Sequence, residues 1–380
     1  MYFNSTLTSK ISVCLVLFLA AVTGPVHGQQ NKQDVMKTGP RVTGNPMQIK
    51  PAGEAPDWAP DIDPQMLAVI EQLKSYEAPP FTELSAFQVR NAKLPAEAVA
   101  ALLMKANMPA AEPKVDISHR QLPVGSDQGT LVRIYTPLEA GTEPLPVIVY
   151  YHGGGWVIAD LETYEAGAIA LAEQVGAIVV SVAYRQAPEE VFPTAHEDAF
   201  AAYQWVVENT DSLGGDPERI ATAGESAGGN LAVAVSLMAM ERDVALPKHI
   251  LSVYPIADGD VESDSYEKYA NALPLSKGFM EWFFDYYYPN WEDDDNPLIN
   301  LTSADLSGLP PTTIINAQID PLEAEGGELE QALREAGVDV ERRLYEGVTH
   351  EFFGMGAILE QAQEAQAFAA ERLKAGLMSK

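Results

Sequence analysis

Cysteine and positive charge are both scarce in this sequence of 380 residues. Its one cysteine, Cys14, excludes an intrachain disulfide, and we expect no thiol catalysis and no zinc held by cysteine ligands. Lys and Arg number 24 against 54 Asp and Glu, so the formal net charge is -30. A surface this acidic repels phosphate backbones, which argues against nucleic-acid binding. The same charge is also what a well-solvated surface would carry.

Motifs for phosphate and metal binding are absent as well. The sequence has neither the Gly-x-x-x-x-Gly-Lys-Ser/Thr of a phosphate-binding loop nor the Gly-x-Gly-x-x-Gly of a dinucleotide-binding turn. His-Glu-Asp at 196–198 lacks the second histidine of a His-Glu-x-x-His zinc helix. Asp-Gly-Asp at 258–260 lacks the glycine and the final glutamate of a calcium loop. We therefore expect no cofactor and no metal.

An apolar run lies close to the N-terminus. Lys10 precedes an almost wholly apolar stretch at 11–22, and Pro25 and small residues follow before Gln29. This arrangement predicts a signal peptide over residues 1–28 and an exported protein, periplasmic or secreted. The run is short for a bilayer, so we expect no stable membrane span after cleavage. An uncleaved segment that anchors the protein to the membrane is the alternative.

Strand-like and helix-like patterns alternate from Val115 onward. The runs 147–151 and 178–182 are continuously apolar, which is typical of strands buried on both faces of a parallel sheet. The alternation predicts an α/β fold with a mostly parallel central sheet flanked by helices. The expected strands are 115–118, 131–135, 147–151, 178–183, 220–223, 250–254, 312–317 and 340–345. The expected helices that alternate with them are 162–174, 194–208, 229–242, 322–336 and 358–373.

The remaining segments predict a cap over this domain. Residues 29–60, rich in Pro, Gly, Asn and Gln, predict a loose N-terminal segment. Residues 61–112 contain two helical patterns and are expected to form the N-terminal part of the cap. The α/β domain then covers 113–380, and its segment 258–300 interrupts the sheet as a cap insertion. An aromatic helix in that insertion, 278–288, is equally compatible with ordinary core packing.

A Gly-x-Ser-x-Gly pentapeptide lies between a strand-like run and a helix-like run, at Gly224-Glu225-Ser226-Ala227-Gly228. In this context a serine is held on a sharp turn at the end of a strand, with its hydroxyl exposed. The flanking glycines let two backbone segments approach where a Cβ would clash. Ser226 is therefore the candidate nucleophile, provided that its partners follow in the right places.

A nucleophilic serine needs a base and an acid that orients the base. On such a sheet they follow the serine in the order acid, then histidine. Of the two histidines after Ser226, His249 precedes a core strand, whereas His350 lies in a loop between the last strand and the last helix. His350 is therefore the predicted base.

The acid is expected after the strand that precedes this loop, where Asp320 stands. An aspartate before Pro321 also suits the N-cap of a helix, so Asp320 alone could be either a cap or the catalytic acid. Its position between Ser226 and His350 in the order of the motifs favours the catalytic acid. Glu323 and Glu325 are weaker candidates, because acidic residues are expected in a first helical turn.

Donors for the oxyanion are expected from two places. Consecutive glycines after a buried strand are entropically unfavourable unless their N–H groups face a substrate oxygen. These glycines are Gly153, Gly154 and Gly155, in a His-Gly-Gly-Gly motif that begins at His152. The N–H of Ala227 adds a donor at the start of the next helix. The sequence does not choose among the glycines, and His152 is expected to be structural.

Together these motifs resemble the hormone-sensitive-lipase-like family of α/β-hydrolases, the bacterial family IV carboxylesterases. The matching segments are 152–156 (HGGGW), 184–189 (YRQAPE), 192–193 (FP), 224–230 (GESAGGN), 320–322 (DPL) with 325–326 (EG), and 347–350 (GVTH). The resemblance implies an α/β-hydrolase fold with a helical cap. It also implies a serine carboxylesterase for short- to medium-chain esters that uses no metal or cofactor. Two positions depart from the pattern, Glu225 and Glu351, where Asp or Thr and Gly are respectively frequent.

The expected reaction partner is a small-molecule ester, and the sequence leaves a homodimer open. An amide or formamide hydrolase on the same scaffold is an alternative, since a serine triad does not choose between an ester and an activated amide. A non-catalytic ligand-binding protein of the same fold is another, although such proteins usually lack a triad member. The candidate pocket residues are the aromatics Trp156, Trp282, Phe283 and Tyr287.

Overall fold

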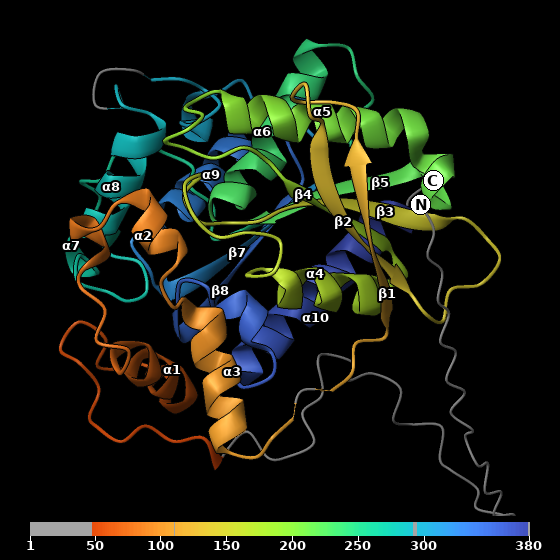
Figure 1. Ribbon diagram of the computed structural model, residues 1–380. Helices are drawn as coiled ribbons and strands as arrows, with labels where there is room; N and C mark the ends of the chain where they lie inside the picture. The colour runs from red at the N-terminus through yellow and green to blue at the C-terminus, as the bar shows by residue number, and fades with distance from the viewer. Residues whose placement is uncertain (1–47, 110, 292–294, 379–380) are drawn as a thin grey trace, which may run out of the picture. The chain divides into compact units, whose positions relative to one another are not determined.

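The computed structural model describes residues 48–109, 111–291 and 295–378 (Figure 1). The predicted signal peptide, residues 1–28, and most of the predicted loose segment lie outside the described residues. Among the residues that are described, no helix is both long enough and apolar enough to cross a membrane.

An eight-stranded sheet forms the centre of the fold, in the order β1-β2-β4-β3-β5-β6-β7-β8. β2 pairs antiparallel with β1 and β4, and all other neighbours are parallel. This confirms the predicted mostly parallel α/β fold, and each predicted strand overlaps an observed one. The strands are β1 (Val115–Leu122), β2 (Thr130–Pro137), β3 (Leu145–Tyr151), β4 (Ile178–Ala183), β5 (Gly215–Glu225), β6 (Ile250–Val253), β7 (Thr312–Ile319) and β8 (Val340–Thr349).

Helices cover both faces of the sheet (Figure 1). The first face carries α5 (Thr194–Asn209), α6 (Ala227–Glu241) and α9 (Glu323–Glu335). The opposite face carries α4 (Glu165–Leu171) and α10 (Glu360–Met378). Successive strand residues point to opposite faces, so Val149 packs into the first core and Tyr150 into the second. Short helical turns complete the fold: Phe81–Glu83, Ala172–Gly176, Thr210–Leu213, Leu301–Ser303 and Phe352–Met355.

Two segments far apart in the chain meet beside the sheet. The early segment supplies α1 (Pro64–Lys74), α2 (Ala86–Arg90) and α3 (Pro95–Lys105), and the insertion supplies α7 (Asp264–Lys268) and α8 (Lys277–Tyr287). The rings of Phe81 and Phe279 pack edge to face, with centroids 5.3 Å apart. The indole N–H of Trp282 donates to the Leu84 carbonyl at 3.2 Å. These contacts join the early segment to the insertion.

Helix α2 was not predicted, because five residues are too few to show helical periodicity. Its start nevertheless carries a local signal in the sequence. Ser85 and Gln88 form a capping box, in which each side chain accepts a hydrogen bond from the other residue's backbone N–H. The spacing Ser-x-x-Gln is therefore the feature that could have located this helix.

Candidate active site

Ser226 occupies a sharp turn between β5, which ends at Glu225, and α6. Its φ of 59° and ψ of -121° are strained for a residue with a side chain. A Cβ on Gly224 would lie 2.1 Å from the Gly228 oxygen, and one on Gly228 would lie 2.0 Å from the Tyr151 oxygen. Glycine at both positions lets the start of α6 approach β5 and β3 this closely. The turn therefore fixes the serine hydroxyl at the carboxyl end of the sheet.

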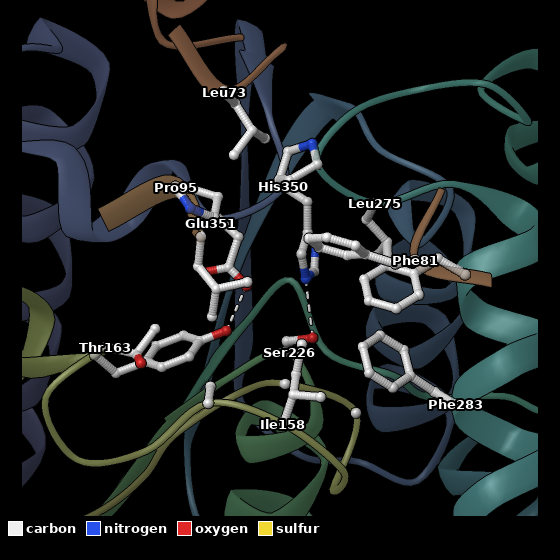
Figure 2. A pocket seen from close by; sticks show the side chains of 17 residues that line it. Leu73, Phe81, Pro95, Ile158, Thr163, Ser226, Leu275, Phe283, His350 and Glu351 are labelled. Carbon is white, nitrogen blue, oxygen red and sulfur yellow. Dashed lines mark hydrogen bonds between the residues drawn. The ribbon is translucent and has the colours of Figure 1, made fainter. Parts of the chain in front are cut away.

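The three predicted residues Ser226, His350 and Asp320 form one hydrogen-bonded chain. His350 Nδ1 lies 2.6 Å from Asp320 Oδ2. His350 Nε2 lies 2.9 Å from Ser226 Oγ, the contact drawn in Figure 2. An ionised carboxylate only accepts, so Nδ1 carries the proton and Nε2 is left to accept from the serine hydroxyl. All three side chains are buried. This arrangement can transfer the serine proton to the imidazole.

Asp320 serves the local backbone as well. Its Oδ1 accepts the Leu322 N–H at 3.0 Å, directly before α9, while its Oδ2 faces the histidine. Asp320 is not the N-cap of α9, because that position belongs to Leu322, so its side chain supports the turn before the helix as well as the triad. The two alternative acids point elsewhere: Glu323 pairs with Arg342, and Glu325 accepts the backbone N–H groups of 257 and 258.

The surroundings of His350 shift its pKa in opposing directions. Burial lowers the pKa of its imidazole, but the charge of Asp320 and the hydrogen bond to it raise that pKa, and the net direction is above 6.5. His152 behaves in the opposite way. Burial lowers its pKa to about 4, and its ring stacks on Tyr184 with centroids 4.3 Å apart. A neutral, packed ring fits the expected structural role of His152.

Ser226 and His350 open into a cavity whose empty volume, with its mouth, is about 520 Å³ (Figure 2). Most of its lining is apolar. The early segment contributes Leu73, Phe81, Leu94 and Pro95, and the insertion contributes Pro274, Leu275, Phe279 and Phe283. Both segments of the predicted cap therefore face the serine.

Of the four aromatics that the sequence offers as pocket residues, only Phe283 lines this cavity. Trp156, Trp282 and Tyr287 lie outside the lining of this cavity. Trp156 is fully buried and stacks on Tyr287, with ring centroids 4.7 Å apart, so both rings fill the core beneath the cap. Trp282 turns away to contact Leu84 and Tyr286.

The glycine loop lies beside the serine, and its members differ in position. Gly154 and Gly155 line the cavity. A Cβ on Gly155 would lie 2.2 Å from the Phe283 ring, and one on Gly153 would lie 2.2 Å from the Tyr164 hydroxyl. Ala227 is the first residue of α6, so its N–H has no acceptor within the helix. The glycine loop and the start of α6 therefore both lie next to Ser226.

Glu225 belongs to a buried polar network that the sequence did not reveal. Its carboxylate accepts hydrogen bonds from the hydroxyls of Tyr150 and Tyr254. The Tyr254 ring lies 4.5 Å from the His350 ring, centroid to centroid. Burial raises the pKa of Glu225 to about 7, against the lowering effect of the two tyrosines. The only signal in the sequence was a carboxylate in an apolar strand, which requires buried donors.

Across the described ranges, no group of three or more His, Cys, Asp or Glu side chains is placed to hold a metal ion.

The chain resembles known esterases in sequence. The profile of the alpha/beta hydrolase fold family matches residues 148–354. Carboxylesterase NlhH of Mycobacterium tuberculosis is 34% identical over 325 residues, which are 84% of this chain and 97% of that protein. Ethyl acetate hydrolase of Pseudomonas putida is 34% identical over 250 residues, covering 64% of this chain and 77% of that protein.

Solved structures agree with the sequence relatives. The hyperthermophilic esterase from Pyrobaculum calidifontis superposes with a TM-score of 0.75 at 35% identity, over 83% of this chain and 98% of that one. A thermostable esterase from Pseudomonas putida superposes with a TM-score of 0.77 at 29% identity, over 85% of this chain and 99% of that one. With the family profile matched across its catalytic core, this chain belongs to the α/β-hydrolase family and, within it, to the hormone-sensitive-lipase-like carboxylesterases.

Proposed function

We propose that this protein is a serine carboxylesterase that hydrolyses short- to medium-chain esters through an acyl-enzyme. The observation that carries the proposal is the hydrogen-bonded chain from Asp320 through His350 to Ser226, which ends in an apolar cavity. A strained serine, an oriented base and backbone donors are the parts that acyl transfer requires. Membership of the carboxylesterase group supports the ester as the substrate.

In the proposed reaction, Ser226 Oγ attacks the ester carbonyl carbon while His350 Nε2 accepts the serine proton. Asp320 keeps the proton on Nδ1 and stabilises the imidazolium that forms. The oxyanion accepts hydrogen bonds from the N–H of Ala227 and from the N–H groups of the glycine loop, Gly153 to Gly155. His350 then protonates the leaving alcohol. Water attacks the acyl-enzyme with the same base, and the carboxylic acid leaves.

A series of p-nitrophenyl esters and matched p-nitroanilides tests this function. We expect the highest kcat/KM for acyl chains of about two to six carbons, because the cavity is small and apolar. Matched anilides should be hydrolysed far more slowly. Faster turnover of anilides or formamides would instead favour the amide hydrolase. Ligand binding without turnover of any ester would favour the non-catalytic binding protein.

The pH dependence of kcat/KM should show an acid limb above pH 6.5, since the pKa of His350 is raised from that value. The imidazole must be neutral to accept the proton, so activity increases as pH rises through this pKa and is lost below it. The charges of Glu351 and Glu225 also raise this pKa. The measurement is initial rates on p-nitrophenyl butyrate, corrected for nitrophenol ionisation.

The matched control for this profile is Glu225→Gln, because Glu225 itself has a pKa of about 7. An acid limb that remains in Glu225→Gln, at the same or a slightly lower pH, belongs to the histidine. An acid limb below pH 6.5 in the native protein would contradict the electrostatics described for His350.

The location of the protein is also a proposal. The apolar stretch at 11–22 supports export to the periplasm or the medium after cleavage before Gln29. N-terminal sequencing of the protein from its native host should then begin at Gln29. A chain that still begins at Met1 and sediments with membranes would favour the anchored form.

A further inference from the structure

A second cavity lies directly beside the active-site cavity and has no part in the reaction proposed above. Its empty volume, with its mouth, is about 490 Å³. The walls are mostly apolar and come from α3, from the start of α4 and from the turn after His350. The residues that line this second cavity alone are Ala96, Val99, Ala166, Glu225, Gly354 and Met355.

The two cavities share one wall. Pro95, Thr163, Tyr164 and Glu351 line both of them. Ser226 lines only the first cavity, whereas its chain neighbour Glu225 lines only the second. Only these four side chains therefore separate the active-site cavity from a second cavity of similar volume.

A single hydrogen bond joins the two largest side chains of the shared wall. The Tyr164 hydroxyl donates to Oε1 of Glu351, although the two residues are 187 positions apart in the chain. Tyr164 precedes α4, and Glu351 directly follows His350. The Tyr164 hydroxyl also lies against Gly153, so the pair stands at the edge of the glycine loop. The wall is therefore part of the immediate surroundings of the reacting atoms.

Glu351 has a backbone conformation that is unfavourable for any residue with a side chain. Its φ of 72° and ψ of 2° lie in the left-handed region, which glycine adopts without strain. The Glu351 side chain is half-buried against Tyr164, and this burial raises the pKa of its carboxyl. A strained backbone and a partly desolvated carboxylate are both unfavourable, so the presence of this side chain has to be explained by the group that it contacts. Its contact is the hydroxyl that completes the wall.

We infer that Tyr164 and Glu351 are specificity-determining residues, whose hydrogen-bonded wall limits the length of the ester that the active-site cavity accepts. The inference rests on the proposed esterase function. An alkyl chain that extends towards Thr163 meets a polar pair instead of open space, and it would have to break the hydrogen bond between Tyr164 and Glu351 to continue. With the wall opened, the chain would enter a second cavity lined largely by Ala96, Val99 and Met355.

The test is the variant Glu351→Gly, which removes the carboxylate and also relieves the left-handed backbone. The measured quantity is the ratio of kcat/KM for p-nitrophenyl decanoate to that for p-nitrophenyl butyrate. We expect this ratio to rise about tenfold or more, as is typical when a hydrophobic pocket gains room for additional methylenes. A parallel series of alkyl acetates shows whether the alcohol or the acyl chain uses the new space. An unchanged profile in both series would overturn the inference.

The matched control is the double variant Glu351→Gly/Val99→Phe. Val99 lines the second cavity and not the first, so a phenyl ring there should fill the new space and restore the preference for short chains. If the double variant keeps the higher ratio, the change arose from a looser His350 and the inference is wrong. Tyr164→Leu opens the same wall from the other side, and it serves if Glu351→Gly does not fold.

The outcomes separate this inference from the proposed function. If the native protein does not hydrolyse p-nitrophenyl butyrate, or if its hydrolysis does not depend on Ser226, the proposed function itself is refuted. A native protein that hydrolyses butyrate, together with variants that retain its chain-length profile, would refute only the role of the wall.

Discussion

Replacing Ser226 by alanine is expected to lower kcat for p-nitrophenyl butyrate by about 10⁶-fold while the protein stays folded. The change removes the attacking oxygen and its hydrogen bond to His350, but it leaves the Cβ and the strained turn in place. Residual activity would come from the oxyanion donors and the cavity. The measurement is kcat on purified protein, with the melting temperature as a test of folding.

His350→Ala should reduce kcat by a similar factor, and the double variant should be hardly worse than either single one. Residues that act as one unit give such non-additive losses, because removing one member already disables the others. The control is His119→Ala, an exposed histidine of β1 that contacts Arg133, which should keep the native kcat. Losses that multiply in the double variant would mean that Ser226 and His350 act separately.

Asp320→Asn is expected to lower kcat by about 10⁴-fold with little change in KM. The asparagine amide can donate to Nδ1, which favours the histidine tautomer that carries its proton on Nε2 and cannot accept from Ser226. In the native protein, the 2.6 Å contact between His350 Nδ1 and Asp320 Oδ2 holds the proton on Nδ1 and leaves Nε2 free to accept from Ser226.

The control for Asp320 is Glu323→Gln, which changes another acid in the same segment. Glu323 pairs with Arg342 at the start of α9 and should leave kcat close to the native value. If Glu323→Gln is inactive and Asp320→Asn is not, then the acid has been assigned to the wrong residue.

The order of motifs in the sequence was sufficient to predict the site because of the topology of the sheet. β5, β6, β7 and β8 are parallel neighbours, so the segments after β5, β7 and β8 all emerge at the same edge. Those segments carry Ser226, Asp320 and His350. The glycine loop after β3 emerges there too, since β3 and β5 are parallel neighbours. Because the strands are parallel, residues that are far apart in the sequence but follow neighbouring strands lie close together in the fold.

The cavity lining was harder to predict, because it depends on packing between segments far apart in the sequence. Composition alone could not distinguish Phe283, which faces the serine, from Trp282 beside it. Helical geometry turns neighbouring side chains by about 100° around the axis, and only contacts with the early segment decide which one faces the cavity. The Tyr164–Glu351 wall has the same origin, since its two residues meet only through the tertiary fold.

Covalent labelling with a fluorophosphonate, followed by peptide mass spectrometry, tests the central claim that Ser226 is an activated nucleophile. The geometry predicts one phosphonyl group per chain, on Ser226, with esterase activity lost in proportion to labelling. Asp320→Asn should be labelled much more slowly, because its histidine no longer activates the serine. Full inhibition with the label on another residue, or an unlabelled Ser226 in an inhibited enzyme, would contradict the assignment.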